Sequence, residues 1–285
     1  MRTFLLLLLV IFCDHYANSQ QPDYSPKSFL NNGDTVELAN KIRLAQNQSV
    51  RFISARTEVM DIDDNKTTHV KAELDLLLCI VGDFSKKLKN GKYQTFVFLQ
   101  PQKMPVRIWE QDYVNDTLSG NWKTYNIEGK LVSEEMYEDN NLQGISRFYQ
   151  IDGKTPMSDI EYSNNKIIER EYSDSGVLLQ ERPYVNGKLN GTGTRYYEDG
   201  TLMEEVDFTN SEFNGHYKYF YPNGKIWVET IYKNGNPWTV IGNYLPTGKE
   251  RDAGTLKNGN GTLIYYSESG DVNEVHEYKG GIRIK

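Results

Sequence analysis

The stretch 213–236 reads FNGHYKYFYPNGKIWVETIYKNGN, and it decides the fold of this chain. Its first half is rich in aromatics and lacks a helical period, and its second half is apolar, β-branched and aromatic. Between them stands Pro222-Asn223-Gly224, where glycine accepts the positive φ that such turns demand. Asn234-Gly235 adds a second turn signal at the end. Two short β-prone runs bounded by turns predict a β-hairpin.

The same phrase recurs through the last two thirds of the chain at steps of 22 to 24 residues. Its anchor is a glycine with an aromatic four residues earlier, in the pairs Tyr125/Gly129, Tyr149/Gly153, Tyr172/Gly176, Tyr196/Gly200, Phe220/Gly224, Tyr244/Gly248 and Tyr266/Gly270. A further glycine stands nine residues before the anchor in five copies, at Gly120, Gly144, Gly191, Gly215 and Gly261. Self-similarity at a short fixed period predicts stacked repeats that cannot fold singly. We expect the anchor glycines and their aromatics to serve the fold.

Seven hairpins in series predict an all-β fold, an elongated, single-file antiparallel meander. Strand alternation predicts that the second and eighth residues after each turn glycine, such as Ile226 and Tyr232, share one face. The fifth, Glu229 in the same copy, then lies on the opposite face. The expected result is a ladder of aromatics that packs the sheet and a ladder of carboxylates that solvates it.

The repeat resembles the MORN-variant repeats of the bacterial YwqK family. The shared pattern is G-x-x-x-x-Y-x-x-x-G-K-[LI]-x-x-E-x-x-Y-x-N-G. It stands here as GNWKTYNIEGKLVSEEMYEDN at 120–140 and as GHYKYFYPNGKIWVETIYKNG at 215–235. The resemblance implies a non-catalytic, protein-binding scaffold, with an antitoxin-like or immunity-like role.

Three copies depart from the pattern. The second carries an extra residue before Tyr162, and the third replaces the early glycine with Ile167. The sixth has Thr239 at that position and lacks both the glutamate and the second aromatic, with Leu256 in the latter's place. We expect the sixth hairpin to be irregular or modified for a contact.

The region before the repeats begins with a predicted signal peptide. Residues 1–19 combine Arg2, a short apolar run and the small-residue site Ala17-Asn18-Ser19. We therefore expect the mature chain to be exported to the periplasm, the cell surface or the medium. No later stretch approaches the length of a membrane span, which predicts no stable membrane insertion. Cys79 alone remains after cleavage, so no internal disulfide is expected.

Residues 20–88 are expected to form a partly irregular N-terminal capping region, and 89–285 to hold seven to eight repeats. The segment 36–45 fits a short helix or a strand equally well. For 70–81 both periods also fit, and we favour a strand. An uncovered first repeat edge requires a cap, which is the physical role expected of this region.

The sequence offers little for catalysis, metal binding or a cofactor, and none of these is predicted. The histidines outside the signal peptide, His69, His216 and His276, fall in different units, whereas a catalytic set must converge. Asp61-x-Asp63-x-Asn65 opens like a calcium loop, but Lys66 stands where the turn glycine belongs. Net charge is −7 with both signs interleaved, so nucleic acid is not an expected partner.

Two functions remain from different classes. The first is binding of another protein along one face of the repeats, and the alternative is binding of a glycan or cell wall through exposed aromatics. Candidate binding residues are Trp238, where the hairpin pattern lapses, and Tyr217 and Tyr219. Trp238 has a competing role as a core plug that compensates for the missing aromatic at Leu256.

Overall fold

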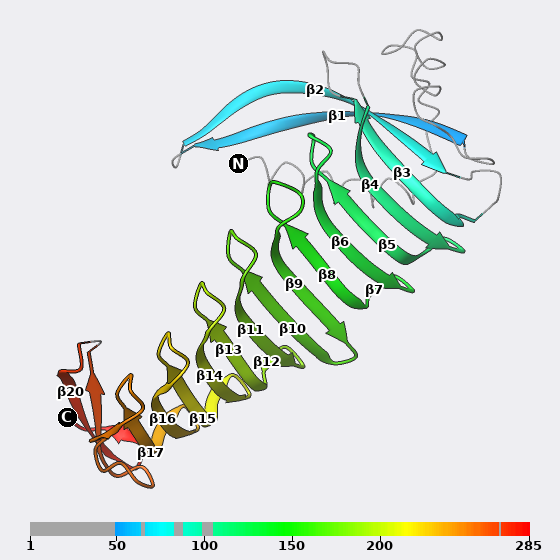
Figure 1. Cartoon of the computed structure of the whole chain (residues 1–285). Coiled ribbons are helices and arrows are strands. Elements are labelled where there is room, and N and C mark those ends of the chain that lie inside the picture. The colour runs from blue at the N-terminus through cyan, green and yellow to red at the C-terminus, as the bar shows by residue number, and fades with distance from the viewer. Residues whose placement is uncertain (1–48, 64–65, 83–87, 99–104, 268) are drawn as a thin grey trace. The chain divides into compact units, whose positions relative to one another are not determined.

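The computed structural model describes residues 49–63, 66–82, 88–98, 105–267 and 269–285. Every regular element in these residues is a β-strand, which confirms the all-β prediction (Figure 1). The predicted signal peptide and the segment 36–45 lie outside the described residues. The chain divides into two compact units, one of residues 1–87 and 93–107 and the other of 88–92 and 108–285.

The first unit is built on a long hairpin. Its strands are β1 (Ser49–Asp63), β2 (Lys66–Gly82) and β3 (Gly91–Phe98), and β2 pairs antiparallel with both of the others. The preference for a strand over a helix at 70–81 is therefore confirmed. In β3, Tyr93, Thr95 and Val97 are buried, as alternation along a strand requires.

The second unit is a meander in which each strand pairs antiparallel with the next one along the chain. Its main strands are β4 (Pro105–Val114), β5 (Thr117–Tyr125), β6 (Leu131–Glu138), β8 (Gly144–Tyr149), β9 (Pro156–Ser163), β10 (Lys166–Tyr172), β11 (Leu178–Val185), β13 (Gly191–Tyr196), β14 (Leu202–Thr209), β15 (Glu212–Phe220), β16 (Ile226–Lys233) and β17 (Asn236–Tyr244). The short strands β7 (Asn141–Leu142), β12 (Lys188–Leu189) and β18 (Glu250–Arg251) pair with β6, β11 and β17.

Two kinds of turn alternate along the meander, and both need left-handed backbone. At the repeat glycine, Gly224 has φ of 77°, and its N–H donates to the Tyr221 carbonyl at 2.8 Å. The other turn is a two-residue pair in which Asn234 and Gly235 have φ of 49° and 78°. Two successive positive φ values define the type I′ hairpin turn, which matches the twist of the flanking strands. The turn chemistry predicted from the sequence is confirmed at both positions.

The remaining anchor glycines adopt the same turn as Gly224. Their φ values lie between 72° and 91°, and each N–H donates to the carbonyl three residues earlier, as it does at Gly129, Gly153, Gly176, Gly200, Gly248 and Gly270. The paired aromatics are all half-buried, namely Tyr125, Tyr149, Tyr172, Tyr196, Phe220, Tyr244 and Tyr266. The anchor glycines therefore set the backbone of the turns, whereas their aromatics are less deeply packed than full core residues.

Hydrogen bonds also join equivalent turns of successive repeats. The Gly235 N–H donates to the Phe213 carbonyl at 2.9 Å, where the preceding asparagine turn ends. At the glycine turns, the Tyr197 hydroxyl donates to the Phe220 carbonyl at 2.6 Å, and the Tyr221 hydroxyl to the Tyr244 carbonyl at 2.8 Å. Each of these repeats is thus bonded to its neighbour through its turns as well as through the sheet.

A β-bulge after the glycine turn corrects one expectation. Phe220 pairs with Ile226, but Tyr219 pairs with Val228, so Trp227 is an extra residue. The same register shift recurs in the other regular hairpins. One extra residue interrupts the period of two, and the prediction that Ile226 and Tyr232 share a face is therefore wrong.

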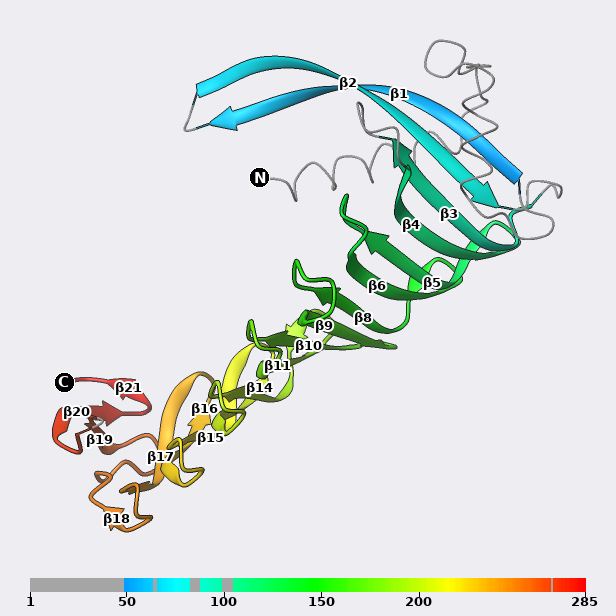
Figure 2. The same ribbon diagram turned by 45° about the horizontal axis from the view of Figure 1, so that its top comes forward.

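The sixth copy ends the continuous sheet. After β18 the chain runs without a strand to β19 (Gly261–Tyr266), which forms a separate sheet with β20 (Val272–Lys279) and β21 (Ile282–Arg283) (Figure 2). Leu256 is 1% exposed and packs with Leu263, Tyr278 and Val240. The expectation of an irregular sixth hairpin is confirmed, and Leu256 fills the place of the missing aromatic.

Candidate binding pocket

A pocket of about 330 Å³ lies in the second unit, where β15, β16 and β17 meet β19. Aromatic side chains make up most of its lining: Tyr217, Tyr219, Trp227, Tyr232, Tyr265 and Tyr266. The buried polar residues Thr230 and Asn243 line it as well. A concave, mainly apolar site with a few polar groups is the usual form of a binding pocket, and this volume is at the small end of that range.

Strand alternation and one β-bulge aim the aromatic side chains of the pocket wall that β15 and β16 form. On β15, Tyr217 and Tyr219 face the pocket by simple alternation. Trp227 is the extra residue of the β15–β16 bulge, and a bulge re-aims a side chain that alternation would send elsewhere. The opposite wall is formed by β19, from which Tyr265 and Tyr266 both line the pocket; the register shift there leaves Asn273 on β20 as the extra residue.

Ring contacts fix the wall that β15 and β16 provide. Tyr221 is buried and stacks on Trp227 with centroids 4.7 Å apart and planes at 2°. Tyr219 meets the same indole edge-on at 5.7 Å. The ring centroids of Tyr217 and Tyr232 lie 5.6 Å apart. Offset-stacked and edge-to-face pairs each add about 0.5–1.5 kcal/mol beyond burial, so the rings are held before any ligand arrives.

Arg251 links the two walls. Its guanidinium lies 3.8 Å from the centroid of the Tyr266 ring. Its Nε donates to Asn243 Oδ1 at 2.7 Å, and its Nη2 donates to the Tyr221 hydroxyl at 3.3 Å. A single side chain therefore contacts β17, β19 and the residue that supports Trp227.

The pocket is an environment that disfavours negative charge on its tyrosines. Burial, followed by the nearby Glu204 carboxylate, raises the pKa of Tyr217. Burial raises the pKa of Tyr232 to about 12. Burial and a hydrogen bond with Tyr278 raise the pKa of Tyr265. All three hydroxyls are therefore neutral at physiological pH and can act as hydrogen-bond donors.

The structure brings two of the three predicted binding residues into this pocket. Tyr217 and Tyr219 lie on the same wall, half-buried among other rings. Trp238 lies elsewhere, against two turns: a Cβ added at Gly259 would come within 2.7 Å of its ring, and one at Gly281 within 3.5 Å. The Lys233 ammonium lies 4.7 Å from the Trp238 ring centroid. Trp238 is half-buried on these glycine turns, and both its role as a core plug and its role in binding remain predictions.

The anchor glycines and their paired aromatics lie almost entirely outside the pocket. Of the seven anchor pairs, Tyr266 alone contributes to the lining. The turn glycines lie at the ends of the hairpins and do not line the pocket, namely Gly129, Gly153, Gly176, Gly200, Gly224, Gly248 and Gly270. Their place agrees with the structural role expected of them, and Tyr266 combines that role with a place in the candidate site.

Trp227 and Tyr265 line the pocket, but no sequence motif marks either one as a site residue. Trp227 follows the repeat turn and reads as an ordinary strand residue unless the recurrent bulge is known. Tyr265 reaches the pocket because the chain leaves the meander after β18 and returns as a second sheet. The departure of the sixth copy from the repeat pattern indicates that this region is unusual, but it does not indicate which residues line a pocket there.

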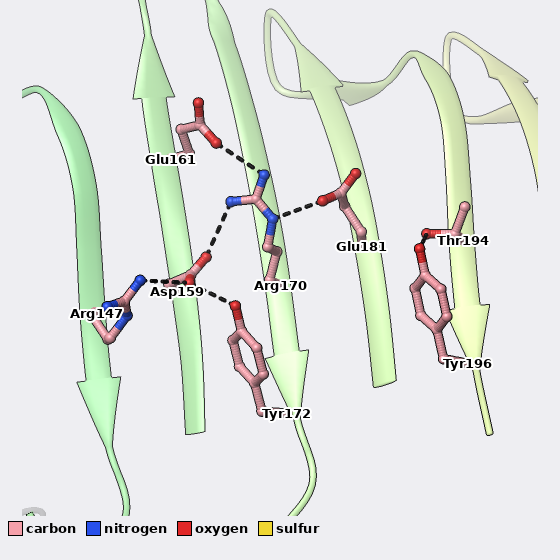
Figure 3. Close-up of polar contacts among 8 residues, drawn as sticks. All are labelled: Arg147, Asp159, Glu161, Arg170, Tyr172, Glu181, Thr194 and Tyr196. Atoms are coloured by element: carbon pink, nitrogen blue, oxygen red, sulfur yellow. Dashed lines mark hydrogen bonds and ion pairs between the residues drawn. The ribbon is translucent and has the colours of Figure 1, made fainter. Parts of the chain in front are cut away.

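A second polar cluster spans β8 to β11 and is shown in Figure 3. The Arg170 guanidinium contacts Asp159 at 3.3 Å, Glu161 at 2.9 Å and Glu181 at 2.7 Å. Asp159, with a side chain 3% exposed, also accepts from the Tyr172 hydroxyl at 2.8 Å. Burial opposes the charge of Arg170, but these hydrogen bonds outweigh it and raise its pKa.

This cluster is satisfied by its own members. Arg147 adds a contact of 3.5 Å to Asp159, and in the next hairpin the Thr194 hydroxyl bonds that of Tyr196 at 3.2 Å (Figure 3). A buried carboxylate with two arginines and a tyrosine is a structural pairing, because each charge already has its counter-charge. It ties the second and third copies together.

Within the described ranges no three His, Cys, Asp or Glu side chains are grouped as a metal ion would require. The same residues contain no helix long and apolar enough to cross a membrane.

The sequence matches one protein family over part of its length. A protein family described only as "Uncharacterised protein" matches residues 129–249. No curated protein matches the sequence. Among solved structures, a TarM variant from S. aureus in complex with fondaparinux, α-GlcNAc-glycerol and UDP is 16% identical, with a TM-score of 0.28. That match covers 38% of this chain and 21% of TarM. A second TarM structure is 16% identical, with a TM-score of 0.26, and covers 36% of this chain and 21% of TarM. The chain thus spans about a fifth of the structures it matches.

Proposed function

We propose that this chain is an exported, non-catalytic repeat scaffold that binds another protein, and that the aromatic pocket receives an anchoring side chain of that partner. The observation that supports the proposal is the gathering of six rings beside the sixth copy, where the hairpin pattern lapses. Binding energy at interfaces concentrates in such pockets, where a bulky or charged side chain becomes fully desolvated. An antitoxin-like role is one form of this proposal and rests on the resemblance alone.

Photo-crosslinking in extracts of the native host tests the proposal. A photo-crosslinking amino acid replaces Tyr265, which is 36% exposed at the pocket, and in a control chain it replaces Ile151, which is 81% exposed on the turn of the second copy. We expect a discrete protein adduct from the first chain and not from the second.

Competition with an excess of uncrosslinkable protein tests whether the adduct forms through the pocket. Excess unmodified protein should abolish the adduct, and excess Tyr219→Ala variant should not, because that variant lacks part of one pocket wall. Equal adducts at both positions, or an adduct that the Tyr219→Ala variant competes away, would contradict the proposal.

The second candidate function is glycan binding, favoured by the same rings, since tyrosine and tryptophan faces stack on sugars. A glycan panel separates it from the first. Saturable binding of one saccharide, lost in Tyr217→Ala and Tyr219→Ala, would support a glycan module in place of a protein-binding one.

A further inference from the structure

A carboxylate stands beside the aromatic wall of the pocket. Glu204 on β14 is directly opposite Tyr219 in the β14–β15 register, so the two side chains share a face. Its side chain is only 17% exposed, and its contact with Arg195 is long, at 3.5 Å. The carboxylate is thus largely withdrawn from water, has only a long contact with a cation, and accepts a hydrogen bond from the Tyr217 hydroxyl of the pocket wall.

The described residues already place cations over aromatic rings, in one case over Tyr266 of the pocket itself. The Lys89 ammonium lies 4.8 Å from the Tyr113 centroid, that of Lys233 lies 4.7 Å from Trp238, and the Arg251 guanidinium lies 3.8 Å from Tyr266. Each distance is within the roughly 6 Å at which a ring face attracts a cation. At the pocket, the ring faces and a carboxylate occur together.

We propose that the pocket binds a cationic side chain, the lysine or arginine of a protein partner, between its ring faces and the Glu204 carboxylate. This inference rests on the proposed function and specifies the chemistry of the anchor. The stem of such a side chain packs on the rings while its charge faces Glu204. The net charge of the chain, −7, favours the approach of a basic partner.

Two matched probes test the inference on the full chain. N-acetyl-lysine N-methylamide carries the ammonium, and N-acetyl-norleucine N-methylamide has the same stem without the charge. Indole N–H signals in NMR report binding, since the chain has four tryptophans and Trp227 is the one that lines the pocket. We expect the Trp227 signal to shift with both probes, and the lysine probe to bind about tenfold tighter.

Neighbouring glutamates supply a matched pair of variants. Glu204→Gln should reduce the lysine preference to within about twofold, because the carboxylate is lost. Glu205→Gln removes the same charge from the next residue, which faces the other side and pairs with Lys218 at 3.0 Å. It should leave the preference intact, and unchanged spectra elsewhere will show that both variants fold.

The other outcomes overturn the inference in distinguishable ways. Equal affinity for the two probes would refute a cationic anchor while leaving an apolar anchor, and so the proposed function, in place. A Trp227 shift with N-acetylglucosamine and with neither amino-acid probe would refute both. Equal loss of preference in Glu204→Gln and Glu205→Gln would show a long-range charge effect and would also refute the assignment of Glu204.

Discussion

At the scale of single residues, the early glycines of the repeat have a reason that the sequence does not show. Gly215 has φ of 132°, and a Cβ there would lie 2.7 Å from Asp207 Cβ. The Asp207 carboxylate accepts from the adjacent His216 N–H at 2.8 Å. In the third copy, where Ile167 replaces the glycine, the β9–β10 register is regular and needs no left-handed residue. The exception to the motif is thus explained by the local absence of a bulge.

The turn glycine gives a residue-scale prediction. Gly224→Val should lower the free energy of unfolding by about 1–3 kcal/mol, because a β-branched residue is strained at φ of 77°. Gly224→Asn is the control, since asparagine tolerates left-handed backbone and should cost much less. Urea denaturation followed by circular dichroism measures both, and equal losses would refute the φ argument.

A second residue-scale prediction concerns the enlarged turn of the second copy. The Asp152 carboxylate accepts from the Thr155 hydroxyl at 2.6 Å and from the N–H groups of Lys154 and Thr155, both at 2.9 Å. The Thr155 hydroxyl is the largest cause that lowers the pKa of Asp152, to about 2. We expect Thr155→Val to move that pKa back toward its usual 3.8.

The sign of the pH effect is set by the direction of the shift. A carboxyl whose pKa is lowered on folding stabilises the turn above its unfolded pKa, and this is lost as pH falls through about 2. NMR titration of the Asp152 carboxyl carbon measures it, with Asp199, whose pKa is lowered by bonds to Thr201, as an internal reference. An unchanged Asp152 pKa in Thr155→Val would contradict the assignment.

At the scale of elements, turn types could be predicted and strand faces could not. The extra residue of the second copy lies in its turn, where Gln150 N–H donates to the Thr155 carbonyl; in the fifth copy Tyr221 N–H reaches Lys225. Glycine and asparagine mark such turns locally. No residue type in the sequence marks the bulge at Trp227. The bulge nevertheless moves the residues after it to the opposite face of the sheet, so alternation counted across it assigns them to the wrong face.

The sixth copy supplies the element-scale prediction. Leu256→Ala should cost about 2–5 kcal/mol, because its side chain is 1% exposed among Leu263 and Tyr278. Phe220→Ala should cost less, since Phe220 is half-buried. Val272→Ala, in the small sheet that holds Leu263 and Tyr278 but with a side chain 56% exposed, should stay within about 0.5 kcal/mol. Chemical denaturation ranks the three, and a cost at Phe220 that exceeds the cost at Leu256 would show that the repeat aromatics form the main core.

At the scale of the second unit, the repeat phase predicted the order of pairing, because every hairpin of the meander bonds to the next one in sequence. The pocket could not be predicted, because Tyr265 lines it together with Tyr219 only after the chain leaves the meander and returns as a second sheet. That return depends on the contacts of Leu256 and Val240, which join distant residues. The repeat motif predicts pairing between strands that are neighbours in sequence, whereas the pocket is formed by strands that are distant in sequence.

A truncated chain tests whether the hairpins of the second unit depend only on their nearest neighbours for stability. Truncation after Asn236 removes β18 to β21 and most of β17, including one wall of the pocket. In a repeat array stability is close to a sum of units and nearest-neighbour terms. Amide protection in β5 to β13 should therefore persist, while β15 and β16 lose protection because Thr230 and Tyr217 become exposed. Hydrogen exchange resolved by residue measures this directly.

Full-length Leu256→Ala is the control, since it loosens the same end without shortening the chain, and it should give the same gradient in weaker form. Uniform loss of protection back to β5 in the truncated chain would instead mean that the sheet folds as one cooperative core.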